Sequence, residues 1–127
     1  MTDQFDKQKY LNLETYRKNS AGVKTPVWFV QDGENLWVWT QDKSGKAGRI
    51  RRNSTVKVVP CKAMGEPVGT WVEGTATADA SPEARTHLIR LMRQKYGLAF
   101  RLFHLSGRLR KEEYTTLRIQ LSAQSKL

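Results

Sequence analysis

The chain has 127 residues, of which 39% are hydrophobic and 27% are charged, and its formal net charge is +10. A chain of this length buries one modest core, so we expect a single domain over residues 1–127. Nowhere does it approach the roughly 20 consecutive apolar residues of a membrane-spanning helix, and its first residues lack the apolar segment of a signal peptide. Cys61 is the single cysteine, which excludes an internal disulfide bond. These features predict a cytoplasmic protein with no membrane partner.

The positive charge is concentrated in two runs that contain no acidic residue. Residues 43–52 carry five basic side chains, and residues 84–111 carry eight. Such a surplus favours an anionic partner of some kind. On charge alone, nucleic acid, an anionic membrane and a phosphorylated small molecule all stay open.

Six segments have the composition or the alternation of β-strands. Pro26 lies in the second of them, and because proline cannot donate to a sheet ladder, we expect it at an edge, a bulge or a ligand-facing position. Asp32 and Gly33 predict a hairpin turn after that segment, and Gly74 in the fifth predicts a bulge or a close approach. In chain order the expected strands are Tyr10–Arg17, Val23–Gln31, Asn35–Thr40, Ser54–Cys61, Thr70–Asp79 and Tyr114–Leu121.

One long helix is well signalled between the fifth and sixth strands. Ser81 is a natural N-cap, Pro82 suits the first helical position, and Gly97 stops the helix. Residues 97–110 fit either a second helix or an irregular arm, and a short helix is expected after residues 44–46. Because hairpins connect the strands, the order favours an antiparallel β-barrel over a parallel βαβ sheet. The apolar face of the long helix, which we expect in the core, comprises Leu88, Leu91, Met92 and Tyr96.

The turn formed by Ser44, Gly45 and Lys46 opens the short helix, where unpaired backbone N–H groups and the helix dipole favour an anion. Ser44 can cap the helix, Gly45 lets a ligand approach the backbone, and Lys46 supplies a positive charge. Arg49 follows one helical turn later on the same face. A Walker A loop is excluded, because the glycine that it needs five residues before its Gly-Lys pair is Thr40 here. A solvated basic loop, a nucleic-acid groove and a site for a small phosphorylated ligand are the alternatives.

The order of several motifs resembles that of a known family. They run "KTPVWFV", "LWVWT", "SGK", "RIRRN", "PC" and "GTWVEGTA", and the resemblance covers about Tyr10 to Leu121. This order is similar to that of the pyridoxamine 5′-phosphate oxidase-like split β-barrels, and among them to the F420-dependent oxidoreductases. The resemblance implies a mainly β fold, namely a six-stranded antiparallel split β-barrel with α-helices. It also implies a homodimer that holds F420, or alternatively FMN, in a groove at the interface.

The resemblance further implies an activity and the residues that hold the cofactor. The activity would be hydride transfer between the cofactor and an electron-poor conjugated small molecule, such as an enone, a quinone or biliverdin. Because "GTWVEGTA" lacks the Arg-Gln pair of the vitamin-forming oxidases, we do not expect oxidation of pyridoxamine phosphate. The alternative is a carrier or sensor of the same fold without turnover, and nucleic acid is not an expected partner. By resemblance, Thr25, Pro26, Val27 and Trp28 run along the ring, Trp39 and Thr40 hold the ribityl–phosphate end, and Ser44, Gly45, Lys46 and Arg49 bind the phosphate.

No catalytic acid or metal site is evident in the sequence. His87 is expected at the surface, His104 in a packing role, and Cys61 as a small buried hydrophobe. Trp37 and Trp39 are two residues apart and therefore share one face of their strand. We expect Trp37 in the barrel core or in a dimer interface.

Overall fold

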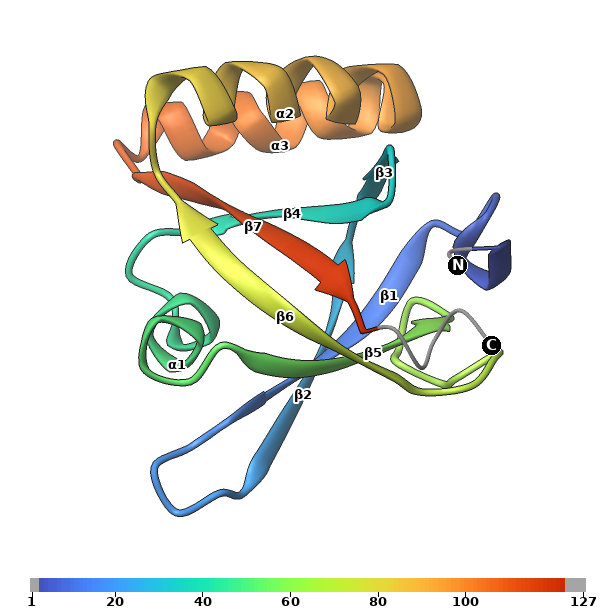
Figure 1. The fold of residues 1–127 in the computed structure, drawn as a ribbon. Helices are drawn as coiled ribbons and strands as arrows, with labels where there is room; N and C mark the ends of the chain where they lie inside the picture. The colour runs from blue at the N-terminus through green and yellow to red at the C-terminus, as the bar shows by residue number, and fades with distance from the viewer. Residues whose placement is uncertain (1–2, 123–127) are drawn as a thin grey trace.

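In the computed structural model, which describes residues 3–122, a curled antiparallel sheet is covered on one side by two helices (Figure 1). The strands are β1 (Tyr10–Tyr16), β2 (Gly22–Trp28), β3 (Val30–Asp32), β4 (Asn35–Gln41), β5 (Thr55–Cys61), β6 (Val72–Asp79) and β7 (Tyr114–Leu121). The helices are the 3-10 helix η1 (Asp3–Phe5) and the α-helices α1 (Gly45–Arg52), α2 (Pro82–Tyr96) and α3 (Leu98–Leu109).

The sheet curls into a barrel that stays open along one side. Its strands hydrogen-bond in the order β2-β1-β5-β6-β7-β4-β3, and every pair is antiparallel. The edge strand β2 comes close to β4 without pairing to it, which leaves a split between the two. Pro26 lies on this edge strand, where its missing N–H is tolerated. A Cβ on Gly74 would lie 2.9 Å from the carbonyl oxygen of Gln120, which confirms the expected close approach.

The segment expected as one strand, Val23–Gln31, forms two strands because Phe29 leaves the sheet. The amide of Phe29 donates to the hydroxyl of Tyr96 (3.0 Å), and its carbonyl accepts a hydrogen bond from Nζ of Lys95 (2.7 Å). Both backbone groups are thus satisfied by α2 in place of a neighbouring strand. The described residues therefore form seven strands where six were predicted, and the additional strand is the short β3.

The interior of the barrel is a closed apolar cluster. Leu36 and Val38 of β4 point into it, and Phe5 of η1 meets Phe29 edge-on with 5.9 Å between ring centroids. Ile50 of α1 covers one end of the barrel. Because successive side chains of a strand point to opposite faces, β1, β4, β5 and β7 each contribute alternate residues. The remaining buried members are Leu11, Leu13, Val56, Val58, Ala76, Leu117, Ile119 and Leu121.

Helices α2 and α3 lie side by side on the outside of the sheet (Figure 1). The hydroxyl of Ser81 accepts the amide of Ala84 (3.2 Å), which confirms the predicted cap of α2. Gly97 joins the two helices with a φ of 59°, a conformation that glycine adopts without strain. Residues 98–109 are helical, which settles the alternative that the sequence left open. Among residues 3–122 no helix has the length and apolar character needed to cross a membrane.

A second apolar cluster fills the space between these helices and the sheet. Its buried members are Val30, Leu88, Met92 and Phe100, and the half-buried Trp37 packs against them. The expected core role of the α2 stripe is therefore confirmed. Of the two alternatives for Trp37, the barrel core is corrected, because this side chain lies outside the barrel and meets His87 of α2 edge-on at 6.4 Å, and the dimer interface stays a prediction.

Candidate functional site

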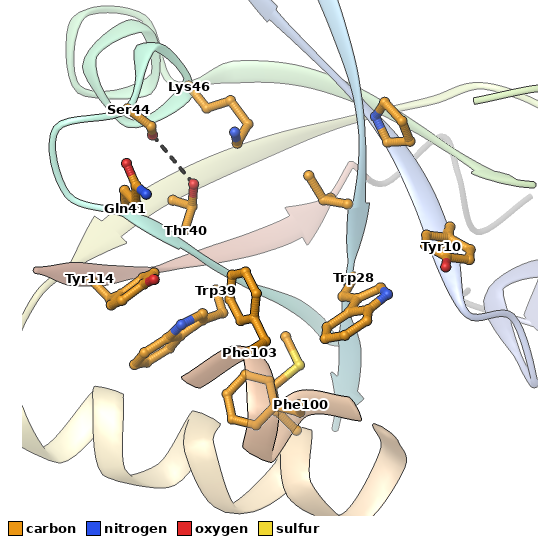
Figure 2. A pocket seen from close by; sticks show the side chains of 13 residues that line it. Tyr10, Trp28, Trp39, Thr40, Gln41, Ser44, Lys46, Phe100, Phe103 and Tyr114 are labelled. Carbon is orange, nitrogen blue, oxygen red and sulfur yellow. Dashed lines mark hydrogen bonds between the residues drawn. The ribbon is translucent and has the colours of Figure 1, made fainter. Parts of the chain in front are cut away.

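A pocket of about 370 Å³ lies at the split between β2 and β4, with α3 along one wall (Figure 2). It combines a polar end near the start of α1 with an aromatic end near α3. Such a mixture of apolar walls and a few convergent polar groups is typical of a small-molecule site. Its lining consists of Tyr10, Pro26, Val27, Trp28, Trp39, Thr40, Gln41, Ser44, Lys46, Met92, Phe100, Phe103 and Tyr114.

The polar end is organised by the cap of α1. The hydroxyl of Ser44 accepts hydrogen bonds from the amide of Ala47 (3.2 Å) and from the hydroxyl of Thr40 (3.3 Å). Because Ser44 acts as the acceptor in both contacts, its own proton is free for a ligand. The amides of Gly45 and Lys46 open the helix and, like the first amides of any helix, have no partner within it.

Lys46 brings a positive charge into this end of the pocket. Figure 2 shows its side chain pointing into the cavity from α1. Burial and the neighbouring Arg49 guanidinium both lower the pKa of Lys46, burial being the larger cause. No carboxylate of residues 3–122 forms an ion pair with it. A cation that is partly desolvated and lacks a counterion is stabilised by an anionic ligand.

The aromatic end is made of rings from separate parts of the chain. Trp28 of β2 stacks on Tyr96 of α2 with 4.6 Å between centroids. Trp39 of β4 stacks on Tyr114 of β7 at 4.9 Å and meets Phe100 of α3 edge-on at 6.0 Å. The indole nitrogen of Trp39 is buried and has no hydrogen-bond partner among the described residues. The ring of Trp39 therefore contributes an apolar face to the pocket wall, while its N–H stays enclosed.

Tyr114 is the most constrained ring of the pocket. Its hydroxyl donates to a carboxylate oxygen of Glu112, and burial together with this contact raises the pKa of Tyr114 to about 12. On its other side the ring touches Gly107 of α3, where a Cβ would collide with the hydroxyl of Tyr114. The phenol therefore stays protonated and fixed at neutral pH.

The structure brings seven of the ten predicted site residues to the pocket. Arg49 lies beside Lys46, but its Nε donates to the hydroxyl of the buried Thr15 (2.7 Å), so the side chain is anchored on β1. Gly45 lies beneath the Arg49 guanidinium, and Thr25 faces Leu13 across β1 and β2. These three residues are not part of the lining. The seven that are comprise Pro26, Val27, Trp28, Trp39, Thr40, Ser44 and Lys46.

Six lining residues were not identified from the sequence. Phe100 and Phe103 come from the segment that could have been a helix or an arm, and Tyr114 from the start of the last strand. The spacing of Phe100 and Phe103 places them on neighbouring positions of one helix face, a signal that a firm helix assignment would have revealed. Nothing local marks Tyr10, Gln41 or Met92 as pocket residues, because only the folded chain brings them there.

The remaining reactive side chains lie outside the pocket lining. His87 is at the surface, as expected, with Nε2 2.7 Å from a carboxylate oxygen of Asp32. His104 packs against Phe100 and Trp39, as expected, and its pKa is lowered by burial and by nearby arginines. Cys61 is buried and reduced, as expected for a small hydrophobe. Among the described residues, no group of His, Cys, Asp and Glu has the arrangement of a metal site.

Comparison with known families gives one match that spans nearly the whole chain. A family profile described as pyridoxamine 5′-phosphate oxidase matches residues 1–123. Among curated proteins no significant match was found. The match confirms the resemblance inferred from the motif order.

Several solved structures share the fold. The conserved hypothetical protein Rv2991 from Mycobacterium tuberculosis is 20% identical, with a TM-score of 0.73 over 94% of this chain and 77% of that one. HutZ, the heme storage protein from Vibrio cholerae, is 16% identical, with a TM-score of 0.72 over 95% and 87%. A protein described as an F420 reductase is 16% identical, with a TM-score of 0.62 over 96% and 93%. At these identities the likeness concerns the fold, and it confirms the predicted antiparallel split β-barrel.

Proposed function

We propose, since this chain belongs to the pyridoxamine 5′-phosphate oxidase family, that its pocket binds a phosphate-bearing flavin-type cofactor and that the protein is an oxidoreductase. The preferred cofactor is F420, with FMN as the alternative. The observation that carries the proposal is that one pocket has a positively charged end and an aromatic end. A cation without a counterion, Lys46, faces one end, and stacked indole and phenol rings line the other.

Each end of the pocket fits one part of such a cofactor. Lys46, the hydroxyl of Ser44 and the first amides of α1 would hold the phosphate. Trp28 and Trp39 would flank the ring. Arg49 would add positive charge from behind Lys46 without entering the pocket. Thr25 and Gly45 would then act through the backbone around the site.

When bound, the cofactor supplies hydride transfer to or from an electron-poor conjugated molecule such as an enone, a quinone or biliverdin. The chain's own residues orient the ring and keep water from it, with Phe100 and Phe103 of α3 forming the cover. The hydroxyl of Tyr10 and solvent are the candidate proton sources. Since Tyr114 is held by Glu112 with a raised pKa, it serves as a wall of the pocket and not as an acid.

The proposal includes a homodimer, in which a second copy covers the open side of the split between β2 and β4. A nucleic-acid partner is not part of it, because the strand tryptophans face the pocket and the α2–α3 layer. A single-strand-binding surface would present its rings to solvent. Sedimentation of the purified protein, with and without cofactor, measures the assembly. A monomer in both conditions contradicts the dimer.

The test is a titration of the purified protein with FMN and with F420, followed by visible absorbance and fluorescence. Lys46→Ala should weaken binding by about 1.5–3 kcal/mol, the contribution of a charge-assisted contact. The matched control is Lys43→Ala, which removes the same charge from the same turn but lies outside the pocket lining. An unchanged affinity in Lys46→Ala, or an equal loss in the control, contradicts the placement of the phosphate. Failure of both cofactors to bind contradicts the function.

A carrier or sensor without turnover is the second candidate. The observation in its favour is that the pocket lining contains no histidine, cysteine or carboxylate. The two candidates differ in one measurement. Reduced cofactor in the presence of a quinone or biliverdin is oxidised faster with the reductase than without protein, whereas a carrier binds it and leaves the rate unchanged.

A further inference from the structure

The outer face of α3 carries an exposed apolar stripe that no described residue covers. Its members are spaced by four, three and four residues, so they fall on one side of the helix. Phe100 and Gly107 are buried on the opposite side, against the sheet. The stripe consists of Leu98, Leu102, Leu105 and Leu109, which are 69%, 60%, 52% and 76% exposed.

Beside this stripe runs a basic groove between α2 and α3. Its volume is about 540 Å³, and it is lined by Arg90, Arg93 and Arg101 together with uncharged residues. The guanidinium groups of Arg93 and Arg101 form no ion pair with the described residues. No acidic residue occurs from residue 84 to residue 111, so Glu83 in the first turn of α2 is the single acidic side chain of the helix pair.

The groove and the stripe face the same way. On α3 the stripe lies opposite the buried Phe100 and Gly107, and on α2 the groove residues lie opposite the buried Leu88 and Met92. Figure 1 shows that α2 and α3 form one layer against the sheet. Leucines and arginines therefore form one continuous face of the molecule, which we call the hairpin face. It comprises Arg90, Arg93, Leu98, Arg101, Leu102, Leu105, Arg108 and Leu109.

The chemistry of the hairpin face selects among possible partners. Two copies would bring like charges together, which opposes self-association. Nucleic-acid interfaces are polar and hydrated, so four exposed leucines would gain little there. An apolar stripe flanked by arginines is the pattern of a helix that lies in the interface of an anionic membrane. The leucines enter the acyl boundary, and the arginines meet the phosphates of the headgroups.

We propose that the hairpin face docks the protein peripherally on anionic phospholipid membranes, with Leu98, Leu102, Leu105 and Leu109 inserted and the groove of Arg90, Arg93 and Arg101 holding lipid phosphate. The proposal departs from the sequence-based expectation of no membrane partner. It goes beyond the proposed oxidoreductase function, because none of these residues lines the cofactor pocket.

The experiment is co-sedimentation of the full chain with vesicles of phosphatidylcholine alone and of phosphatidylcholine mixed with phosphatidylglycerol. The protein should bind the anionic vesicles, bind the neutral ones far less, and lose binding as salt is raised. R93Q/R101Q should bind the anionic vesicles about 30-fold more weakly, since each arginine near the surface contributes roughly fivefold. L102Q/L105Q should show a loss of similar size.

Matched variants elsewhere on the surface serve as controls. K18Q/K57Q removes two exposed charges far from the helices, and M64Q removes an exposed apolar side chain. Circular dichroism verifies that each variant is folded. Retained binding in the controls and lost binding in the hairpin-face variants support the proposal. Any of three results overturns it: no binding of the wild type, equal binding to neutral vesicles, or a homodimer that L102Q/L105Q converts to monomers.

Discussion

The two apolar clusters of the molecule share strand β4 and lie on its opposite faces. Leu36 and Val38 point into the barrel, where aliphatic side chains and two phenylalanines are almost fully enclosed. Trp37 and Trp39 point outward, where half-buried rings surround a smaller buried centre beneath α2 and α3. The barrel cluster is closed on itself, whereas the outer cluster ends at the pocket. The pocket therefore lies where packing is least complete.

The outer cluster also contains polar atoms that the barrel cluster avoids. The indole nitrogens of Trp37 and Trp39 are buried without a partner among the described residues. An unpaired buried donor costs stability. The inner face of β4 thus contributes to the closed core, and its outer face contributes Trp39 to the pocket wall.

The largest expected effect is the difference in stability between the two clusters. Leu117→Ala, inside the barrel, should lower the free energy of unfolding by about 2–5 kcal/mol, because a closed core cannot collapse around the cavity. Phe103→Ala, in the pocket wall, should cost less than half as much, since this ring is 43% exposed already. Urea denaturation measures both values. Equal losses would mean that the two clusters are equally closed.

A smaller loss of stability is expected when the hydrogen bonds of Tyr96, which join the two clusters, are removed. The hydroxyl of Tyr96 accepts the Phe29 amide (3.0 Å) and donates to the Lys9 carbonyl (2.7 Å). Tyr96→Phe leaves the Phe29 amide without a partner, so it should cost about 1–3 kcal/mol of unfolding free energy. The control is Tyr16→Phe, whose hydroxyl meets only Glu14 at the surface end of β1. A Tyr96→Phe protein as stable as the control would show that the strand break does not depend on this hydroxyl.

A pH dependence of stability is expected at the same contact. The ammonium of Lys95 lies 3.7 Å from the ring centroid of Phe29, and burial lowers the pKa of Lys95 from 10.5 to about 8. Between these values the unfolded chain holds the proton more tightly than the folded chain, so stability should rise as pH increases from about 8 towards 10.5. Lys95→Met should lack this rise. Urea midpoints of both proteins across this pH range measure the difference, and parallel curves would contradict it.

The polar end of the pocket could be predicted from the sequence because it is local. Thr40, Ser44 and Lys46 lie within seven consecutive positions, and the cap at Ser44 follows from short-range hydrogen bonding. The strand alternation and the α2 cap were predictable for the same reason. Arg49 shows the limit of this reasoning, since its contact with Thr15 on β1 arises only in the folded chain.

Distant segments assemble the aromatic end, so it could be predicted only in part. The family resemblance identified Trp28 and Trp39, but not Phe100, Phe103 or Tyr114. Phe103 and Trp28 are far apart in the sequence, yet their rings meet at 5.9 Å. The break at Phe29 has the same origin, because the groups that satisfy its backbone belong to α2. Local propensity favoured one continuous strand over Val23–Gln31, but the contacts of Phe29 with α2 interrupt it. The short strand β3 is the result of this interruption.

Gly107 of α3 controls the width of the pocket, although it is not part of the pocket lining. With only hydrogen on its Cα, the helix approaches β7 until it meets the hydroxyl of Tyr114, and Phe100 and Phe103 are carried to the cavity on the same helix. One added methyl group at this position would act as a spacer between helix and strand. A relative with a larger residue than glycine at this position would hold α3 further from β7. Its pocket would then be wider and would accept a thicker ligand.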